Sequence, residues 1–379
     1  MRFWGITGTN GKTTTAWILA DFINAAPGRV CGLITTVEVN TGARAFYTGY
    51  TTPPLVELKR IYAEMEQNGC TDCVMEVSSH AIHQHRTGDT VFAGGAFTNL
   101  SEDHLDYHKT MEEYFRVKRS FAEQIARDLF GAATPAPEMG RRDFPPYVVC
   151  LDGGYGREMY AAVGNLPLNV LPVTNAKPRY DLSRLPLVGD YNRSNVLVAA
   201  ALAEAAGVTP ETIQARIPAL TPRWGRLELV ANDACAAQVY VDFAHTPDGL
   251  EKVLSAARGF TPGRLWVVFG AGGDRDPMKR PLMGAACARL ADRLVVTSDN
   301  PRSEDPLKII DAVLGGVPAA YRDRTTVEPD RRRAIEFALA QSGKGDVVIV
   351  AGKGHETTQE IAGVKHPFDD REVVRAYRR

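Results

Sequence analysis

The stretch RFWGITGTNGKTTTAWILADF, residues 2–22, decides the fold of the first half of the chain. The run RFWGIT has the apolar character of a strand, and the segment from TTTAWIL onward has the apolar spacing of a helix. Between them lies the turn GTNGKT, where glycines let backbone N–H groups approach phosphate oxygens and the helix N-terminus favours an anion. Lys12 can reach the terminal phosphates, and the hydroxyl of Thr13 can ligate Mg²⁺.

The spacing of this turn departs from the strict pattern G-x-x-x-x-G-K-[ST], because Ile6 occupies the position of the first glycine. The alternative is a glycine-rich turn that contains Lys-Thr by coincidence. The strand before the turn and the helix after it favour phosphate binding. The predicted phosphate-binding residues are Gly8, Thr9, Asn10, Gly11, Lys12, Thr13 and Thr14.

Short apolar runs alternate with helix-period segments along most of the chain. This alternation predicts an α/β fold in which helices cover parallel-rich sheets. Later runs with the pattern of strands are CGLITTVEV (31–39), CVMEV (73–77), VYVDFA (239–244), RLWVVFGA (264–271), DRLVVTS (292–298) and DVVIVAGKG (346–354).

Proline and glycine mark two interruptions of this alternation. In IPALTPRWGR (217–226) they predict a boundary between domains at 1–222 and 223–379. The Pro- and Arg-rich stretch 128–147 predicts a surface excursion inside the first domain.

Composition excludes several classes of protein. The 379 residues include 44 Lys and Arg against 45 Asp and Glu, a net charge of −1 that argues against a nucleic-acid partner. No apolar run approaches the roughly 20 residues of a membrane helix, and the first residues lack the layout of a secretory signal. We therefore expect a cytoplasmic protein without membrane insertion. Cys70 and Cys73 have a suggestive spacing but no second Cys or His pair, so Cys73 is predicted to be a core residue.

Three segments after the phosphate loop carry polar groups near predicted strand ends. Glu76 lies in an apolar strand, where an unpaired carboxylate is costly and a Mg²⁺ ion is the natural compensation. The alternatives are a lysine partner for Glu76, a helix-capping role for His104 and a solvated helix face for Lys118. The spacing of His80, His83 and His85 fits no usual zinc pattern.

These segments occur in the order found in a known family. TGTNGKTTT, EVSSH, TNLSEDHLDYH, Lys118, GDYNRSN, VDFAHTPD, GDRD, DNPR and GKGHE together resemble the Mur ligase family, which shares a catalytic core with folylpolyglutamate synthetase. Within the family the chain is most similar to the MurE type. The resemblance implies a P-loop ATPase domain followed by a Rossmann-like C-terminal domain.

The resemblance also implies a reaction. Such enzymes use ATP to convert a substrate carboxylate to an acyl-phosphate, which an amine then attacks to form an amide. Lys12, Glu76, His104 and Lys118 match the catalytic residues. Thr13, Glu76 and His104 match metal-site residues for two Mg²⁺ ions, and Lys118 matches a lysine that becomes carbamylated and supports the second ion. A carbamate would replace a repelling ammonium by an oxygen ligand.

Further matches concern the nucleotide. Asn192 and Asn195 fall on the segment that contacts adenine in relatives, although Asn192 could equally cap a helix. Arg226 matches an arginine near the nucleotide. Asp330 and Arg331 also resemble a family segment, without a firm role.

The amine substrate is indicated by a second group of residues. Asp299-Asn300-Pro301-Arg302 is similar to the signature of members that add meso-diaminopimelate rather than L-lysine. Diaminopimelate carries an extra carboxylate that a guanidinium can bind with two hydrogen bonds. The predicted amino-acid-binding residues are Arg275, Asp299, Asn300, Arg302, Gly352 and Glu356.

Hydroxyls and one arginine indicate how the acid is bound. Thr51, Thr52, Ser78 and Arg86 match residues that hold the muramoyl-dipeptide portion, and they suit an anionic, oxygen-rich ligand. The partners expected are small-molecule and peptide substrates, and we expect a monomer.

The N-terminus departs from the family pattern. Full-length members carry a UDP-binding domain of about a hundred residues before the phosphate loop, whereas here the loop begins almost at Met1. Two interpretations stay open. The coding start has lost that domain from a peptidoglycan-precursor ligase, or this is a two-domain ligase for a peptide or secondary-metabolite carboxylate without a UDP group. A protein that binds a nucleotide without catalysis is a third reading, which the intact motif residues disfavour.

Overall fold

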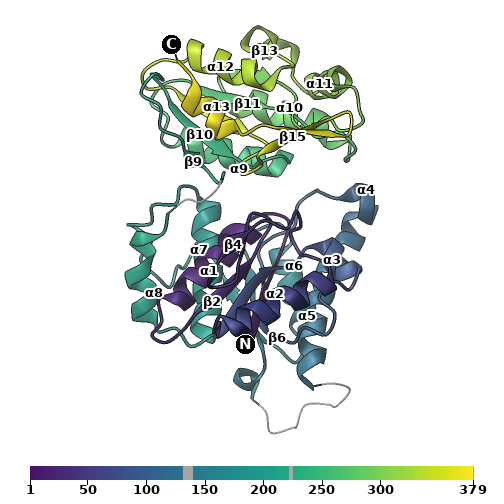
Figure 1. Ribbon diagram of the computed structural model, residues 1–379, viewed down its shortest axis with the longest axis vertical. Coiled ribbons are helices and arrows are strands. Elements are labelled where there is room, and N and C mark those ends of the chain that lie inside the picture. Colours follow the sequence, from purple (N-terminus) through teal and green to yellow (C-terminus); the bar gives the residue numbers. More distant parts are fainter. Residues whose placement is uncertain (131–139, 222–224, 379) are drawn as a thin grey trace. The chain divides into compact units, whose positions relative to one another are not determined.

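The computed structural model describes residues 1–130, 140–221 and 225–378 and divides into two compact units, Met1–Thr221 and Pro222–Arg379. Each is an α/β unit built on its own parallel-rich sheet, as predicted (Figure 1). The boundary predicted between residues 222 and 223 lies outside the described residues.

The first unit is built on an eight-stranded sheet with the order β4-β3-β2-β5-β1-β6-β7-β8. The strands from β2 to β8 in this order are parallel, and β3 and β4 add an antiparallel edge. The elements are β1 (Arg2–Thr7), α1 (Lys12–Asn24), β2 (Cys31–Ile34), β3 (Val39–Asn40), β4 (Ala45–Phe46), α2 (Leu55–Gln67), β5 (Asp72–Glu76), α3 (Ser79–His83), β6 (Phe92–Phe97), α4 (Leu105–His108), α5 (Met111–Phe130), η1 (Arg141–Asp143), β7 (Pro146–Cys150), α6 (Gly156–Val163), β8 (Asn169–Val173), α7 (Asp190–Ala205), α8 (Pro210–Arg216) and η2 (Ile217–Ala219).

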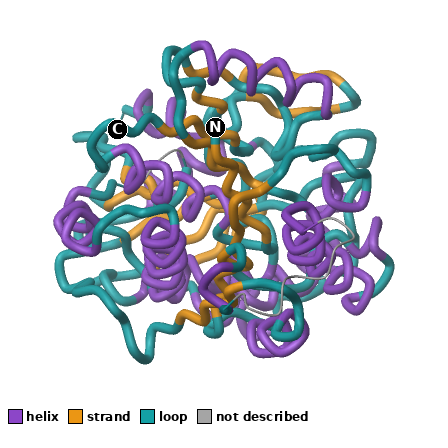
Figure 2. Tube along the Cα trace, turned by 90° about the horizontal axis from the view of Figure 1, so that it is seen from below, coloured by secondary structure: helices purple, strands orange, loops and turns teal. Residues whose placement is uncertain are grey.

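Helices cover both faces of this sheet, as the view along it shows (Figure 2). Trp4 and Ile6 of β1 pack in one core cluster with α1 and α7, and β6 contributes Phe92 to a second cluster with α2 and α5. Gly5 of β1 lets α5 approach closely, because a Cβ there would lie 2.3 Å from Cζ of Phe121. The buried Cys73 is a core residue, as predicted.

One predicted strand of the first unit is wrong, and the bounds of one predicted excursion differ. CGLITTVEV (31–39) is not one strand, because β2 ends at Ile34 and a turn closed by Thr35 N–H and the Glu38 carbonyl (2.9 Å) leads into β3. The hydroxyl of Thr35 accepts from the Glu38 N–H (3.0 Å) and stabilises that turn. At the two ends of the excursion predicted at 128–147, α5 continues to Phe130 and β7 begins at Pro146. The central part of that prediction, residues 131–139, lies outside the described residues.

The second unit is built on a six-stranded sheet with the order β13-β12-β11-β14-β10-β9, parallel except for β9. A hairpin of β15 and β16 forms a separate two-stranded sheet. The elements are β9 (Glu228–Leu229), β10 (Gln238–Asp242), α9 (Pro247–Arg258), β11 (Leu265–Phe269), α10 (Lys279–Leu290), β12 (Arg293–Val296), α11 (Pro306–Leu314), η3 (Ala319–Arg324), β13 (Thr325–Val327), α12 (Arg331–Gln341), β14 (Val347–Ala351), β15 (Thr358–Ile361), β16 (Val364–Pro367) and α13 (Asp370–Ala376).

A buried ion pair ties the strand ends of the second unit together. Arg331 is 1 % exposed and forms two 2.8 Å hydrogen bonds with the Asp370 carboxylate. Its guanidinium also donates to the carbonyls of Ala351 (2.9 Å), the last residue of β14, and of Ser298 (3.3 Å), which follows β12. Asp330 caps α12 by accepting from the Arg333 N–H. Asp330 and Arg331, which had no firm role in the sequence analysis, therefore have a structural role: they cap α12 and join the ends of β12 and β14.

Among the described helices, none combines the length and the apolar character that crossing a membrane requires.

Candidate active site

The loop after β1 is held by the loop after β6, its neighbour in the sheet. Thr9 N–H donates to the Asn99 carbonyl (2.9 Å), Asn10 N–H donates to the Asn99 side chain (3.0 Å), and Thr98 Oγ1 donates to the Asn10 carbonyl (2.7 Å). Gly8 has φ +148°, and a Cβ there would lie 2.0 Å from Thr98 Oγ1. Only glycine fits this approach, so the loop geometry explains that residue directly.

Lys12 folds over this loop. Its Nζ donates to the carbonyls of Gly8 (3.0 Å) and Thr9 (2.8 Å). Gly11 is the N-cap of α1 with φ +84°, so the loop leads directly into the N-terminus of a 13-residue helix. This is the strand, loop and helix arrangement that binds phosphate in proteins.

Two asparagines of α7 lie beside the start of α1. Asn195 accepts from the Thr15 hydroxyl (3.3 Å) and donates to the Asn192 side chain (3.2 Å). The alternative that Asn192 caps a helix is wrong: Gly189 occupies the N-cap of α7, and Asn192 Nδ2 donates to the Val188 carbonyl (2.8 Å) from inside the first turn. Neither asparagine caps α7. Through its contact with Thr15, Asn195 places this pair of asparagines next to the glycine-rich loop.

Glu76 is a buried carboxylate at the end of β5, only 1 % exposed. Its Oε1 accepts from the Thr13 hydroxyl (2.7 Å) and the Thr36 N–H (2.9 Å), and its Oε2 accepts from the Thr36 hydroxyl (3.3 Å). All three donors are neutral. Within the described part of the chain no Lys or Arg pairs with Glu76, so the alternative of a lysine partner is wrong. A buried anion with neutral donors only, next to the hydroxyl of Thr13, fits a divalent cation.

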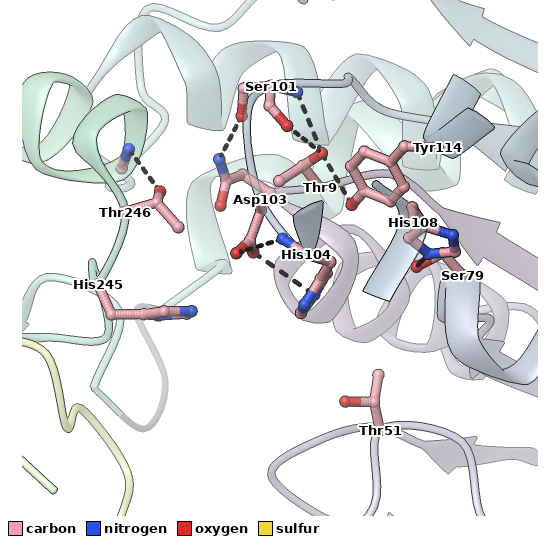
Figure 3. Close-up of polar contacts among 12 residues, drawn as sticks. Thr9, Thr51, Ser79, Ser101, Asp103, His104, His108, Tyr114, His245 and Thr246 are labelled. Atoms are coloured by element: carbon pink, nitrogen blue, oxygen red, sulfur yellow. Dashed lines mark hydrogen bonds and ion pairs between the residues drawn. The ribbon is translucent and has the colours of Figure 1, made fainter. Parts of the chain in front are cut away.

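His104 lies at the N-cap of α4 in a left-handed conformation (φ +58°), but its side chain does not cap that helix. Its Nε2 lies 3.5 Å from an Asp103 carboxylate oxygen (Figure 3). The His104 ring meets the His80 ring edge-on, with the ring centres 4.9 Å apart. Desolvation lowers the pKa of His104, helped by the positive charges of His80, Lys12 and Lys118. The imidazole is therefore neutral near pH 7, the form that binds metals.

Lys118 of α5 is 1 % exposed, so the alternative of a solvated helix face is wrong. Its Nζ donates to the Gly8 carbonyl (2.8 Å), the same oxygen that Lys12 contacts, and lies 4.7 Å from the centre of the Tyr114 ring. Burial, and then the charge of Lys12, hold the pKa of the Lys118 amine well below its usual range. The amine therefore carries a reduced fraction of positive charge.

The predicted acid-binding residues form one cluster. Thr52 Oγ1 donates to the Glu76 carbonyl (2.8 Å) and accepts from the Ser78 N–H (3.1 Å), while Arg86 Nη1 donates to the Thr52 carbonyl (3.2 Å). The hydroxyl oxygens of Thr36 and Thr51 lie 2.9 Å apart, within hydrogen-bond distance. The cluster therefore borders the Glu76 carboxylate.

In the second unit, the loops after β11 and β12 lie against each other. Gly273 N–H donates to the Asn300 carbonyl (2.9 Å), and Arg302 Nη1 donates to the Gly273 carbonyl (2.7 Å). A Cβ built on Gly272 would lie 3.0 Å from Arg302 Nη1 and 3.8 Å from Cγ of Arg275. Two arginines thus flank one glycine. Arg302 Nη2 makes no hydrogen bond within the described residues, so it can bind an incoming carboxylate.

The loop after β14 joins this group. Glu356 Oε2 accepts from Asn300 Nδ2 (2.8 Å) and from the ammonium of Lys353 (2.8 Å). Gly352 has φ +117°, and a Cβ there would lie 2.3 Å from Asp299 Oδ2. That buried oxygen has no hydrogen-bond donor within the described residues. The predicted amino-acid-binding residues therefore converge on the ends of three adjacent strands.

Arg226 also lies in the second unit, with its guanidinium 4.5 Å from the centre of the Phe243 ring. Its predicted contact with a nucleotide stays a prediction.

The motif pattern did not single out Thr36 or Lys353. Thr36 falls inside a segment that has the pattern of a continuous strand, and only the turn at 35–38 brings its N–H to Glu76. Lys353 lies within GKGHE, where a lysine flanked by glycines gives no signal of burial.

Comparisons with known proteins point in one direction. The family model described as Mur ligase middle domain matches residues 6–133, and the model described as Mur ligase, glutamate ligase domain matches residues 225–354. A protein of Aquifex aeolicus called UDP-N-acetylmuramoyl-L-alanyl-D-glutamate–2,6-diaminopimelate ligase is 38 % identical over 390 residues, which cover 98 % of this chain and 76 % of that protein.

Solved structures agree. A structure of a ligase with the same name has a TM-score of 0.60 and 32 % identity, covering 99 % of this chain and 78 % of that one. Mycobacterium tuberculosis folylpolyglutamate synthase, complexed with ADP and AMPPCP, has a TM-score of 0.60 over 93 % of this chain and 88 % of that one. At 19 % identity, the second likeness concerns the fold alone.

We expect acid to destabilise the first unit through His108. This imidazole is fully buried against the Ser79 hydroxyl (2.9 Å), and burial, with the charges of His80 and Lys118, lowers its pKa from 6.5 to about 4. Between these values the unfolded chain binds a proton that the folded chain excludes, so the free energy of unfolding falls by about 1.4 kcal/mol per pH unit as the pH drops.

Urea unfolding at pH 7 and pH 5 measures this effect. His108→Gln should reduce the difference between the two pH values, whereas His85→Asn, at an exposed position with φ +52°, should leave it unchanged. An equal pH dependence in wild type and His108→Gln would contradict the assignment.

Proposed function

Because the chain belongs to the Mur ligase family of ATP-dependent, ADP-forming ligases, we propose that it joins meso-diaminopimelate to the glutamate carboxylate of a UDP-N-acetylmuramoyl-L-alanyl-D-glutamate-type acid. One observation supports diaminopimelate as the amine substrate. The second unit places arginines and a carboxylate together at three strand ends, which matches an amino acid with both a distal carboxylate and a distal ammonium.

The reaction class follows from the two groups of residues. The substrate carboxylate takes the γ-phosphoryl group of ATP, giving an acyl-phosphate and ADP. The nitrogen of the amine then attacks the acyl carbon, phosphate leaves, and the nitrogen loses a proton. No protein nucleophile is needed, so the side chains contribute by positioning and by compensating charge.

Phosphate binding is assigned to the loop of residues 8–14. Lys12 would exchange the carbonyls of Gly8 and Thr9 for phosphate oxygens, because both are acceptors within reach of the same ammonium. Asn192 and Asn195, beside this loop, and Arg226 in the second unit complete the proposed ATP-binding set. The position of the asparagines against α1 supports their part of it.

Magnesium is assigned to Thr13, Glu76, His104 and Lys118. The residues fit the ion: Glu76 is a buried anion without a cation partner in the described chain, Thr13 offers a hydroxyl beside it, and His104 is neutral. Mg²⁺ supplies charge compensation for phosphate oxygens when it is bound.

Lys118 is proposed to be carbamylated. Its amine is buried, has a lowered pKa and shares an acceptor with Lys12, so a charged ammonium is disfavoured there. The neutral nitrogen can attack CO₂ and lose a proton, which leaves an anionic carbamate whose oxygens suit Mg²⁺.

Acid binding is assigned to Thr51, Thr52, Ser78 and Arg86, and amine binding to Arg275, Asp299, Asn300, Arg302, Gly352 and Glu356. The clustering of each set supports these assignments. The identity of the acid beyond its carboxylate, action in the cytoplasm and a monomeric state stay predictions.

We expect ADP formation with diaminopimelate and not with L-lysine, when UDP-N-acetylmuramoyl-L-alanyl-D-glutamate and ATP are present. Arg302→Met removes the partner of the distal carboxylate, so kcat/KM for diaminopimelate should fall by about thirtyfold or more. Exposed Arg332→Met is the matched control and should behave as wild type. Failure of the wild type to form ADP with diaminopimelate would refute the assignment.

We expect Glu76→Gln to raise the Mg²⁺ concentration needed for half-maximal ADP formation by about tenfold or more, because it removes the anion that faces the ion and keeps an acceptor for Thr13. A magnesium titration of the steady-state rate measures this. Glu66→Gln, on an exposed part of α2, should leave the requirement unchanged. An unaltered requirement in Glu76→Gln would show that the ion binds elsewhere.

Carbamylation can be observed directly. After equilibration with ¹³CO₂, we expect a carbamate carbon in the ¹³C NMR spectrum of the wild type that Lys118→Ala lacks. Lys59→Ala, at an exposed lysine, should keep it. A wild-type spectrum without that carbon would exclude the modification under those conditions.

A further inference from the structure

A fully buried lysine lies behind the proposed amine-binding residues. Lys353 is 0 % exposed, and its Nζ donates to Glu356 Oε2 (2.8 Å) and to Asn300 Oδ1 (3.1 Å). An ammonium removed from water is costly unless it is paired and hydrogen-bonded. Both of its side-chain partners belong to the group assigned to the amine, so the position of Lys353 is coupled to that group.

The two donors around Glu356 leave its carboxylate in a defined orientation. Lys353 Nζ and Asn300 Nδ2 both contact Oε2, each at 2.8 Å. Within the described residues Oε1 receives no hydrogen bond, and the side chain is 30 % exposed. One oxygen is therefore anchored, and the other is available to a ligand.

The backbone fixes where this anchor lies. Glu356 N–H donates to the Lys353 carbonyl (2.9 Å), which closes a turn directly after β14. Within that turn Gly354 has φ +53°, and a Cβ there would lie 2.7 Å from Cβ of Phe243. The turn is packed against Phe243, the residue after β10, and this packing fixes the position from which the side chain of Lys353 points into the interior.

We propose that Lys353 is a positioning residue for amine selection: it anchors Oε2 of Glu356 so that Oε1 meets the distal ammonium of the substrate. The inference rests on the proposed function. Lys353 contacts neither the reacting amine nor the phosphates in this scheme. Because Lys353 already holds the Glu356 side chain in place, that side chain loses little conformational entropy when the amine binds.

The competing explanation is that Lys353 only stabilises the fold. A structural role would weaken the use of every amine alike. A positioning role would weaken only those that carry the distal ammonium. L-2-Aminopimelate has the two carboxylates of diaminopimelate and a hydrogen in place of the distal ammonium, so this pair of amines separates the two explanations.

The experiment compares kcat/KM for the two amines in the wild type, Lys353→Met, Glu356→Gln and the double variant. Met fills the space of the lysine stem without charge, and Glu356 is exposed enough to be hydrated when its partner is gone. Lys344→Met, at an exposed lysine of the same unit, is the matched control. Thermal unfolding of each variant reports on the fold.

In Lys353→Met we expect the preference for diaminopimelate over aminopimelate to fall by at least about tenfold, the size of one lost charge-assisted hydrogen bond. The loss should appear in KM for diaminopimelate, with aminopimelate used as in the wild type. The double variant should be no worse than Glu356→Gln alone, because both changes remove the same interaction.

Equal losses for both amines, or additive losses in the double variant, would overturn the role of Lys353 while the proposed function stands. A wild type that forms no ADP with diaminopimelate would overturn the proposed function and this inference together.

Discussion

The parallel pairing of β1 with β5 on one side and β6 on the other is the constraint on which the first unit depends. Parallel strands end at the same edge of a sheet, so the loops that follow them meet there. The glycine-rich loop, the carboxylate of Glu76 and the anchor residues Thr98 and Asn99 come from these three strands. Segments about 90 residues apart in the chain therefore form one polar cluster.

Charge is distributed unevenly in that cluster. Two lysines contact the Gly8 carbonyl, and a buried carboxylate is surrounded by neutral donors. Each arrangement is costly by itself, since like charges repel and an unpaired anion loses its hydration. Anionic phosphates near the lysines and a cation near Glu76 would relieve both costs. The unliganded protein thus holds uncompensated charges at positions where the proposed ligands would supply charges of opposite sign.

The second unit repeats the principle with different chemistry. The loops after β11, β12 and β14 meet at one sheet edge. Arg331, paired with Asp370, joins the ends of β12 and β14 by donating to the carbonyls of Ser298 and Ala351. In this group the ammonium of Lys353 is paired with the carboxylate of Glu356. Pairing orients a carboxylate, which is what recognition of a particular amine requires.

The sequence by itself determined the alternation of strands and helices, the glycine-rich loop between β1 and α1 and the residues that resemble a ligase, because these depend on local patterns and on residue type. The features that the sequence did not predict are contacts between residues far apart in the chain. The contact of Thr36 N–H with Glu76 and the burial of Lys353 depend on neighbours far away in the chain. Only the tertiary structure decides such features, since burial and pairing are properties of the surroundings and not of the residue.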